Sequence, residues 1–212
     1  MTDTIKSGSL ATFAILSNGK AIPSEDNVYS LKINQQIGAV DTAEIMLLDG
    51  NPETGHFTTS ESKTFEPGVT ILIQLGYDGV NKTVFEGTVT NQVITINNET
   101  GSALNVICKN TVVRENNYTA GEMGAPKLEV TYGDNIFELQ LKMDGEHPSS
   151  VVTKYTGFFI TSGTTLAMTN TMITVKGLGN RFNEDLFISG VEHVVSAGNW
   201  TTEFQIGIPA GV

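Results

Sequence analysis

The chain has few of the residues that cross-link a fold or carry out catalysis. Among its 212 residues there is one cysteine, one tryptophan and three histidines. A lone cysteine cannot form an intramolecular disulfide, so burial and strand pairing must stabilise the fold. Cys108 lies in the apolar run Val106-Ile107-Cys108, and we expect it to be a buried free thiol.

Basic residues are also scarce. The 12 Lys and Arg residues face 23 Asp and Glu residues, which gives a net charge of −11. This balance disfavours binding to nucleic acid or to an anionic membrane surface. No apolar run approaches the ~20 residues that span a bilayer, and Met1–Lys6 lacks the layout of a secretory signal. We therefore expect synthesis in the cytoplasm and no membrane insertion by this chain.

The three histidines do not suggest a metal site. His56 lies in a polar loop, His147 precedes a proline and His193 falls within a predicted strand; none has a second His or Cys at ligand spacing. Glu192 and His193 are the one suggestive acid–base pair, but neighbouring residues of a strand point to opposite faces. We expect His193 to be a packed or hydrogen-bonded structural residue.

Three carboxylates raise the possibility of a glycan-cleaving enzyme. Asp41, Glu44 and Asp49 suggest paired acids of the kind that glycosidases use, although turns and solvated strand faces explain them better. The run Asp49-Gly50-Asn51 resembles the start of a calcium loop but lacks the later ligands, which favours a turn.

Trp200 suggests a sugar-stacking platform. Phe204 and Ile206 share its face of the predicted strand, however, which favours a core position. The sequence contains no phosphate loop, dinucleotide fingerprint or nucleophile elbow. We assign no catalytic, cofactor-binding or metal-binding residue and expect no cofactor.

The residues that are abundant favour strands. The chain has 27 Thr and 22 Gly, together with many Val and Ile. β-Branched residues fit the pleated surface of a sheet. Turn signals such as Asn18-Gly19 and Asp78-Gly79 separate the apolar runs, and no amphipathic helix exceeds about three turns. The composition predicts an all-β protein, with at most minor α content.

Alternation of apolar and polar residues locates individual strands. The clearest is Val69–Leu75, and Lys82–Ile96 predicts one long strand bent at Gly87, where a missing side chain permits a barrel corner. Residues 51–66 form a polar loop, and residues 144–170 are poorly patterned. Many short strands with Gly and Asn turns indicate a sandwich or a barrel.

An internal repeat divides the chain. Residues 71–89 and 173–191 each show an alternating strand, a Leu-Gly, a polar loop, and a strand with Phe and Gly. We predict two related small β-barrel domains, with an arm at residues 1–10, a first barrel at 11–112, a linker at 113–126 and a second barrel at 127–212.

Several motifs, in the same order, resemble the hub proteins of contractile injection systems, that is, the phage late control protein D type and the hub part of the valine-glycine-repeat spike protein. The matching stretches begin with Asn18-Gly19-Lys20, Asp41-Thr42-Ala43-Glu44-Ile45, Leu48-Asp49-Gly50, Phe65-Glu66-Pro67-Gly68, Ile71-x-Ile73-x-Leu75-Gly76-Tyr77 and Val84-Phe85-Glu86-Gly87. They continue with Leu104-x-Val106-x-Cys108, Leu128-Glu129-Val130-Thr131-Tyr132-Gly133, Gly177–His193 and Gly198–Gly207.

The resemblance implies a duplicated hub that assembles as a homotrimer. Six barrels would form a ring of pseudo-six-fold symmetry between a six-fold tube and a three-fold spike. The implied partners are an inner-tube protein, a spike or spike-tip protein and other baseplate proteins, within a phage-tail-like or secretion particle. We expect strands 69–75, 84–93, 172–178 and 186–195 to frame the barrels and their exposed faces to touch tube subunits.

Two departures from the family stand out. Its members usually have a mixed α/β region after the first barrel and more sequence before the last strands, whereas residues 110–126 and 144–170 are short here. Spike-type members also continue beyond the position of Gly207. We expect either a hub-only member or a sequence from which segments are missing.

The sequence thus supports three hypotheses. The first is a non-enzymatic structural hub. The second is an all-β adhesin or carbohydrate-binding module that uses a loop such as 51–66, and the third is the glycan-cleaving enzyme. The hub predicts a trimer, the adhesin a monomer with an exposed aromatic platform, and the enzyme two carboxyl groups that converge in a cleft.

Overall fold

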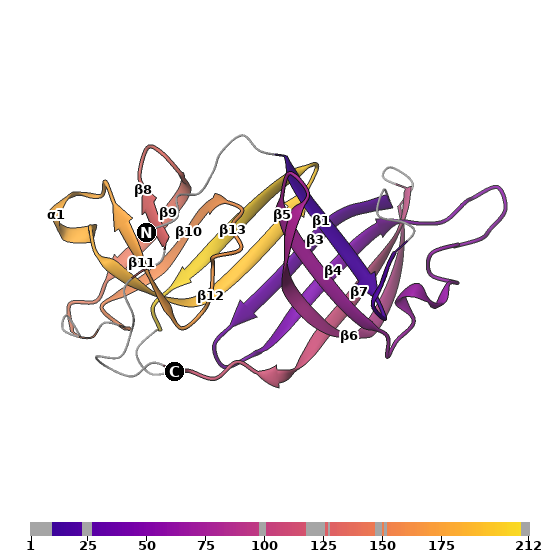
Figure 1. Ribbon diagram of the computed structural model, residues 1–212, viewed down its shortest axis with the longest axis horizontal. Coiled ribbons are helices and arrows are strands. Elements are labelled where there is room, and N and C mark those ends of the chain that lie inside the picture. Colours follow the sequence, from indigo (N-terminus) through magenta and orange to yellow (C-terminus); the bar gives the residue numbers. More distant parts are fainter. Residues whose placement is uncertain are drawn as a thin grey trace.

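The structure is a computed structural model that describes residues 10–22, 27–97, 101–117, 126, 128–146, 150 and 152–208. These residues form a 13-stranded sheet with two short helical turns, which confirms the predicted all-β class. No helix within these ranges is long and apolar enough to cross a lipid bilayer. Figure 1 shows an elongated molecule, with the early strands in one half and most of the late strands in the other.

The N-terminal half contains seven strands and the 3-10 turn η2. They are β1 (Ala11–Ser17), β2 (Lys20–Ala21), β3 (Val28–Gln36), β4 (Val40–Leu48), η2 (Lys63–Phe65), β5 (Thr70–Tyr77), β6 (Val80–Asn97) and β7 (Gly101–Val113). The β1–β2 turn has φ of 47° at Asn18 and 78° at Gly19, and the β5–β6 turn has 53° at Asp78 and 81° at Gly79. Both pairs of positive angles fit the tight hairpin turns predicted from the sequence.

The C-terminal half contains six strands and one short helix. They are β8 (Leu128–Thr131), β9 (Ile136–Met143), β10 (Tyr155–Ser162), β11 (Thr171–Lys176), α1 (Gly179–Phe182), β12 (Asp185–Ser196) and β13 (Asn199–Ile206). The strand β10 corrects the interpretation of residues 144–170 as unpatterned. Phe158, Phe159 and Ile160 follow one another, so apolar side chains lie on both faces and alternation is hidden.

Eight strands form a continuous antiparallel sheet through both halves, in the order β6-β7-β4-β3-β12-β13-β10-β9. The halves meet at the β3–β12 pair, whose register runs from Gln36 opposite Gly190 to Ser30 opposite Ser196. Beyond β6 the sheet continues through β5 to β1 and β2. On the other side, β11 pairs with the first part of β12 and, in parallel, with β8.

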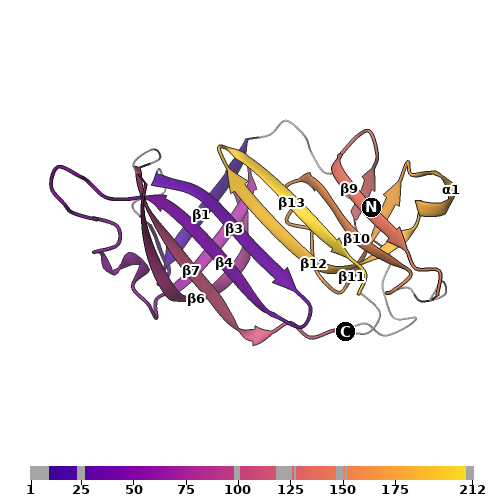
Figure 2. The same cartoon turned by 180° about the vertical axis from the view of Figure 1, so that it is seen from behind.

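Two hydrophobic clusters lie against this sheet, one in each half. The hairpin β12–β13 belongs to both, because Val195 and Trp200 near its turn pack in the first cluster while Val191 and Phe204 pack in the second. Figure 2 shows the hairpin lying between the two halves. The domain limits predicted from the sequence remain a prediction, and residues 1–9 and 118–125 lie outside the described ranges.

Each half curls around its own cluster. Within the described ranges, however, no strand pair closes either half into a complete barrel. Side chains bridge part of the opening in the first half. The Tyr77 ring lies 5.2 Å from the Trp200 ring, and the Tyr77 hydroxyl donates to the Gly163 carbonyl oxygen at 3.0 Å. The halves are therefore barrel-like in curvature while their strand pairing stays open.

The repeated segments both fold as antiparallel hairpins, β5–β6 and β11–β12. Their connections differ, because a two-residue turn joins the first pair and helix α1 lies between the second pair. The registers also differ: Ile71 lies opposite Gly87, whereas Ile173 lies opposite Leu186. The superposition of the two units remains a prediction.

Candidate functional site

One face of the eight-stranded sheet covers the two clusters, and the side chains of the opposite face point away from them. We call this opposite side the polar face. Its central row contains one residue from each strand, and the strand registers align them as Thr88, Lys109, Thr42, Asn34, Glu192, Glu203, Ile160 and Glu138. The polar face is therefore a single surface that extends over both halves of the molecule.

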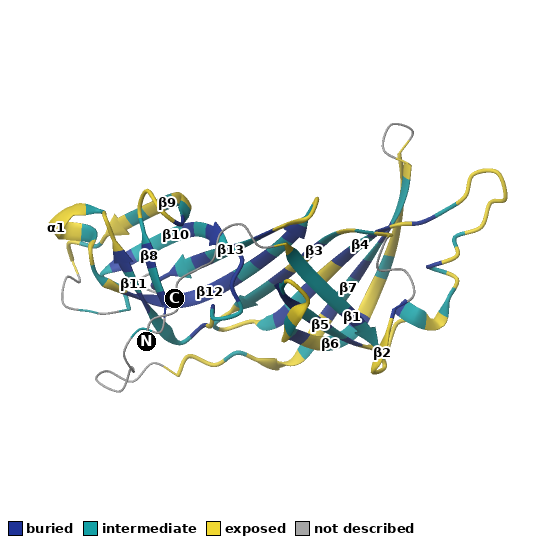
Figure 3. Ribbon diagram, turned by 45° about the horizontal axis from the view of Figure 1, so that its top comes forward, coloured by how far each residue is buried: buried dark blue, intermediate teal, exposed yellow. Residues whose placement is uncertain are grey.

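Alternation along each strand produces this surface, as β13 illustrates. Successive side chains of a strand point to opposite sides. The inward positions of β13 are buried, and they are Trp200, Thr202, Phe204 and Ile206. The side chains at its outward positions are only half-buried; these residues are Thr201, Glu203 and Gln205. Figure 3 shows the same change between the buried and intermediate colours along the central strands.

Charged groups on the polar face are close enough to interact. Lys32 Nζ lies 3.0 Å from Glu192 Oε2, and Asn34 Nδ2 donates to the same oxygen at 3.3 Å. Glu203 lies directly opposite Glu192 in the β12–β13 register. Like charges in this arrangement destabilise a sheet. Burial raises the pKa of Glu203, and the nearby Glu192 carboxylate raises it further.

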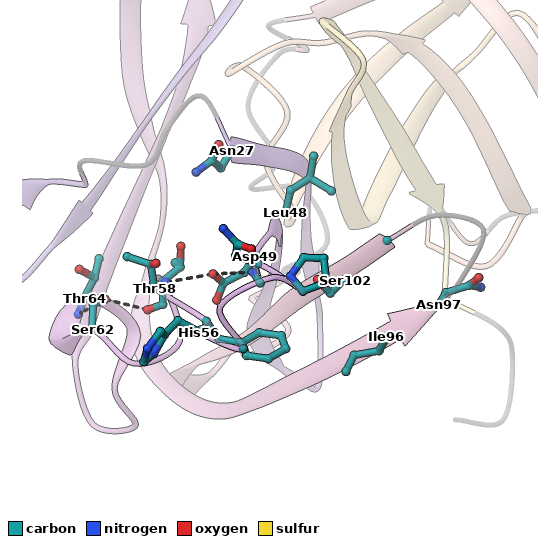
Figure 4. Close-up of a pocket in the computed structure, with 17 residues that line it drawn as sticks. Asn27, Leu48, Asp49, His56, Thr58, Ser62, Thr64, Ile96, Asn97 and Ser102 are labelled. Atoms are coloured by element: carbon teal, nitrogen blue, oxygen red, sulfur yellow. Dashed lines mark hydrogen bonds between the residues drawn. The ribbon is translucent and has the colours of Figure 1, made fainter.

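A groove of about 1060 Å³ lies at the far end of the first half, between the loop 49–64 and the β6–β7 hairpin. Figure 4 shows Leu48 and Ile96 among the labelled residues of its lining. Among the described residues of this lining, Asp49 is the one carboxylate. Within the part of the lining that the structure describes, no second carboxyl group accompanies Asp49, whereas the enzyme hypothesis requires a convergent pair.

Asp49 organises the loop that borders the groove. Its side chain accepts hydrogen bonds from the backbone N–H groups of Gly50 at 3.0 Å, Thr59 at 3.1 Å and Ser60 at 2.8 Å. The turn itself covers residues 52–55, directly after the run Asp49-Gly50-Asn51 where the sequence predicted it. Among the described residues, no group of three or more His, Cys, Asp or Glu side chains is placed to hold a metal ion.

Asp41 corrects the expectation of a solvated carboxylate. It lies on the core side of β4 and is buried. Arg114 donates from Nε to Asp41 Oδ1 at 2.9 Å and from a terminal nitrogen to Oδ2, and Gln35 Nε2 donates to Oδ2 at 3.0 Å. Arg114 also donates to Thr169 Oγ1 at 3.2 Å, so this pair ties β4 to a loop of the C-terminal half. From the sequence, Arg114 was predicted to lie in a linker. The one sequence signal for this pair was the position of Asp41, which the alternation of β4 places on the core side, where a carboxylate needs a partner.

His193 and Glu192 point to opposite faces, as predicted. His193 is buried, its Nδ1 lies 3.0 Å from Thr202 Oγ1, and Trp200 Nε1 lies 3.4 Å from Nδ1. Burial lowers the pKa of His193 to about 4, so the ring is neutral at physiological pH. Trp200 is itself buried against Tyr77 and His193, which agrees with the predicted core position.

The remaining candidate residues that the structure describes are Cys108 on β7, His56 in the loop 49–64 and Glu44 on β4. Cys108 is buried and free, and burial raises the pKa of its thiol to about 12. The exposed His56 lies 3.4 Å from Glu61 in the loop beside the groove. Glu44 is exposed on the polar face, and His147 lies outside the described residues.

Of the four strands expected to present an assembly surface, two contribute to the polar face. Residues 84–93 lie in β6 and residues 186–195 in β12, whereas residues 69–75 lie in or next to β5 and residues 172–178 lie in and after β11. The remaining strands of the face, β10 above all, were not expected to share a surface with them. Their alignment depends on the register between strands, which a single sequence does not reveal.

Comparisons with known proteins give one family and several similar structures. A model of the Alg8 N-terminal domain family matches residues 7–122. No curated protein sequence matches the chain. A tail protein from Neisseria meningitidis MC58 is similar in structure with a TM-score of 0.63 and 8% identity, and the similarity covers 95% of this chain and 97% of that chain.

Two further solved structures cover almost as much of the chain. The 43 kDa tail protein of prophage MuSo2 from Shewanella oneidensis has a TM-score of 0.60 and 9% identity over 97% of this chain and 100% of that chain. The E. coli c3393 protein has a TM-score of 0.56 and 9% identity over 93% of this chain and 77% of that chain. It is described as a component of the type VI secretion system with structural similarity to the T4 bacteriophage tail proteins gp27 and gp5. The chain thus has the fold of these tail proteins over nearly its whole length.

Proposed function

The chain belongs to the Alg8 N-terminal domain family, and from its fold and its polar face we propose that it is a structural hub of a contractile injection system. Three copies form a ring that joins a six-fold tube to a three-fold spike. The observation that carries this proposal is the central row of the polar face. It passes without interruption from the strands of the first cluster to those of the second.

The symmetry argument rests on two units in one chain. A heterologous contact between identical copies generates a closed ring when the rotation closes, whereas an isologous contact ends in a dimer. Three copies of a chain with two clusters present six similar units around an axis. Such a ring has true three-fold symmetry for a spike and pseudo-six-fold symmetry for a tube.

The dimensions of the sheet suit a hollow ring. Each copy supplies eight antiparallel strands, so three copies supply three times eight, or 24. At about 4.8 Å between strands and a tilt of about 40°, such a ring has a backbone diameter of roughly 40–50 Å. The polar face then lines the bore, because the other face of each sheet is occupied by the clusters.

The proposed role is non-enzymatic. It needs contacts with an inner-tube protein, a spike or tip protein and other baseplate proteins, and it needs no cofactor. The net charge of −11 opposes attachment to nucleic acid during assembly. The proposal places the chain in a phage-tail-like or secretion particle after its synthesis in a bacterial cytoplasm, and the fold similarity to tail proteins supports that placement.

The groove beside loop 49–64 favours a second candidate function, an adhesin or carbohydrate-binding module. Leu48 and Ile96 expose 51% and 70% of their surface there, which gives a ligand apolar contacts. Trp200 does not contribute, because it is buried in the first cluster. The adhesin gives the extended polar face no role, whereas the hub proposal does.

Native mass spectrometry of the purified chain tests the hub. The expected species has three times the 22.7 kDa mass of the chain. A protein that remains monomeric at every concentration, and that does not join purified tube protein, would contradict the proposal. Binding of the monomer to glycans, lost on Ile96→Asp, would then support the adhesin.

A further inference from the structure

The side chains of Tyr77 and Trp200 bridge part of the opening in the first half, and they meet at the backbone of Gly163. The two ring centroids lie 5.2 Å apart, and the Tyr77 hydroxyl donates to the Gly163 carbonyl oxygen at 3.0 Å. The Gly163 N–H donates to the Trp200 carbonyl oxygen at 2.8 Å. We call the contacts among these three residues the tryptophan bridge. It joins β5 of the first half to β13 and to the segment that follows β10.

Gly163 fits under the indole ring because it has no side chain. A Cβ at Gly163 would lie 1.9 Å from Trp200 Cδ2, 2.2 Å from Cγ and 2.4 Å from Cε2. The ring therefore lies directly against the backbone of Gly163. Only 4% of Trp200 is exposed, so opening of the tryptophan bridge moves this ring from the core into solvent.

The hydrogen bonds of His193 determine where its neutral ring carries the proton. Trp200 Nε1 lies 3.4 Å from His193 Nδ1, and an indole N–H is a donor only. Thr202 Oγ1 accepts from the Thr164 N–H at 3.1 Å and lies 3.0 Å from the same Nδ1, so the hydroxyl proton of Thr202 donates to this nitrogen. His193 Nδ1 therefore accepts both hydrogen bonds, and the ring proton is on Nε2.

A second proton on His193 removes this acceptor, because both nitrogens of an imidazolium ring are donors. Thr202 adapts by rotation of its hydroxyl group, since the oxygen has a second lone pair that accepts the new N–H. Trp200 has no such alternative, because its N–H lies at the positive edge of the indole ring and faces a positively charged N–H. A buried donor without an acceptor costs free energy, so the proton acts mainly on Trp200.

The ionisable groups around His193 leave a proton there without a counter-ion in the described part of the chain. Its core-side neighbours in the strand registers, Ile33 on β3 and Thr202 on β13, do not ionise, and segment 163–170 contains no ionisable residue. The ionisable core-side groups of β4, β5 and β7 are Asp41, which is paired with Arg114, Tyr77 and Cys108. The charged residues of the paired strands that lie near His193 are on the polar face, and they are Lys32, Glu192 and Glu203. Burial thus lowers the pKa of His193 to about 4.

We propose that the network around His193 is an acid-sensitive switch, in which a proton on His193 releases Trp200 from Gly163 and Tyr77 and opens the tryptophan bridge. The pairing of β12 with β3 and β13 uses backbone groups, which do not titrate. The opening therefore separates β5 from the C-terminal half while the sheet stays paired. This inference is independent of the trimer, and its failure would leave the proposed hub unchanged.

The two pKa values of His193 set the size of the effect. In the open form the ring is solvated and its pKa is about 6.5, whereas in the closed form it is about 4. The proton therefore favours the open form as the pH falls. The ratio of open to closed molecules should rise about tenfold for each pH unit between these values, or roughly 300-fold in total. Above about pH 6.5 the ratio should not change with pH.

Hydrogen exchange of the Trp200 indole N–H, followed by NMR, measures this ratio. The chain has one tryptophan, so the indole signal needs no further assignment. The protection factor compares the exchange rate with that of a free indole at the same pH, and it should fall roughly 300-fold between about pH 6.5 and about pH 4. In ¹⁵N spectra at neutral pH, we expect His193 to carry its proton on Nε2. A proton on Nδ1 would overturn the proposal.

Two variants show whether His193 causes the change. His193→Asn places an amide oxygen near the position of Nδ1, where it accepts from Trp200 without titrating, so protection should stay constant with pH. The control is the double variant His56→Gln and His147→Gln, which removes the other two histidines of the sequence and should retain the wild-type dependence. Equal pH dependence in the wild-type protein and in His193→Asn would contradict the switch.

Urea distinguishes local opening from unfolding of the whole chain. A local opening exposes little surface, so exchange of Trp200 at about pH 5 should be nearly independent of low urea concentrations. The backbone N–H groups of the β3–β12 pair report on global unfolding, and their exchange should accelerate with urea. If Trp200 shows the same urea dependence as these groups, the opening is global and the proposal is wrong.

Tyr77→Phe tests the other side of the tryptophan bridge. It keeps the ring beside Trp200 but removes the hydrogen bond to Gly163. The ratio of open to closed molecules should rise about threefold or more at every pH, with an unchanged pH dependence. Wild-type protection of Trp200 in this variant would contradict the role of Tyr77 in the bridge.

Discussion

Removal of the Asp41 carboxylate should destabilise the protein substantially, because it breaks a buried charge pair. Asp41 has 9% and Arg114 30% of its side chain exposed, and Asp41 also accepts from Gln35. Loss of one partner of a fully buried pair costs about 3–5 kcal/mol. Because solvent reaches part of Arg114, we expect Asp41→Ala to lower the free energy of unfolding by about 3 kcal/mol, near the low end of that range.

Urea unfolding followed by Trp200 fluorescence measures this effect, since Trp200 is buried in the folded chain. Glu44→Ala is the matched control, because Glu44 lies on the same strand but on the exposed polar face. It should change stability by less than about 0.5 kcal/mol. A double-mutant cycle with Arg114→Ala should give a coupling of about 2 kcal/mol. Equal effects of Asp41→Ala and Glu44→Ala, or a coupling near zero, would refute the role assigned to the pair.

Three further predictions follow from individual side chains. Glu203→Gln should stabilise the protein by roughly 0.5 kcal/mol at neutral pH. Burial and Glu192 hold the pKa of Glu203 above its unfolded value. The ionised Glu203 therefore destabilises the folded chain increasingly as the pH rises through the folded pKa. The stabilisation by Glu203→Gln should vanish below about pH 4, where the carboxyl group is protonated in both states. The pKa of His193 is lowered in the folded protein, so the unfolded chain takes up this proton at a higher pH than the folded chain does. The free energy of unfolding should therefore decrease as the pH falls from about 6.5 to about 4. His193→Gln should remove this slope in urea unfolding measured as a function of pH. Cys108 should react with a thiol reagent only when urea unfolds the chain, and rapid labelling of the folded protein would contradict its burial.

The alternation within single strands made much of the fold predictable. The hairpin turns at Asn18-Gly19 and Asp78-Gly79 require two residues with positive φ, which Asn, Asp and Gly tolerate. The inward and outward faces of β13 follow from period-two patterning alone. The long β6 strand was predicted nearly to its ends. At its predicted bend, a Cβ on Gly87 would lie 2.6 Å from the Lys109 carbonyl oxygen, so a larger residue does not fit.

The features that sequence reasoning missed depend on contacts between distant residues. Strand β10 has apolar side chains on both faces, and its Gly157 has φ of 145°, so neither alternation nor an ordinary strand signal marked it. The partner of Arg114 lies 73 positions away at Asp41. The hairpin β12–β13 serves two clusters because of where its strands pair, not because of its composition. The same holds for the polar face, whose central row exists only once the seven registers between its eight strands are aligned.

A cryo-microscopy map of the assembled ring tests the account most directly. We predict three-fold symmetry, six similar units around the axis, and one unbroken sheet whose polar face, with Glu192 and Glu203, lines the bore. A ring in which the polar face points outward, or in which the copies are not related by three-fold symmetry, would contradict the proposed hub.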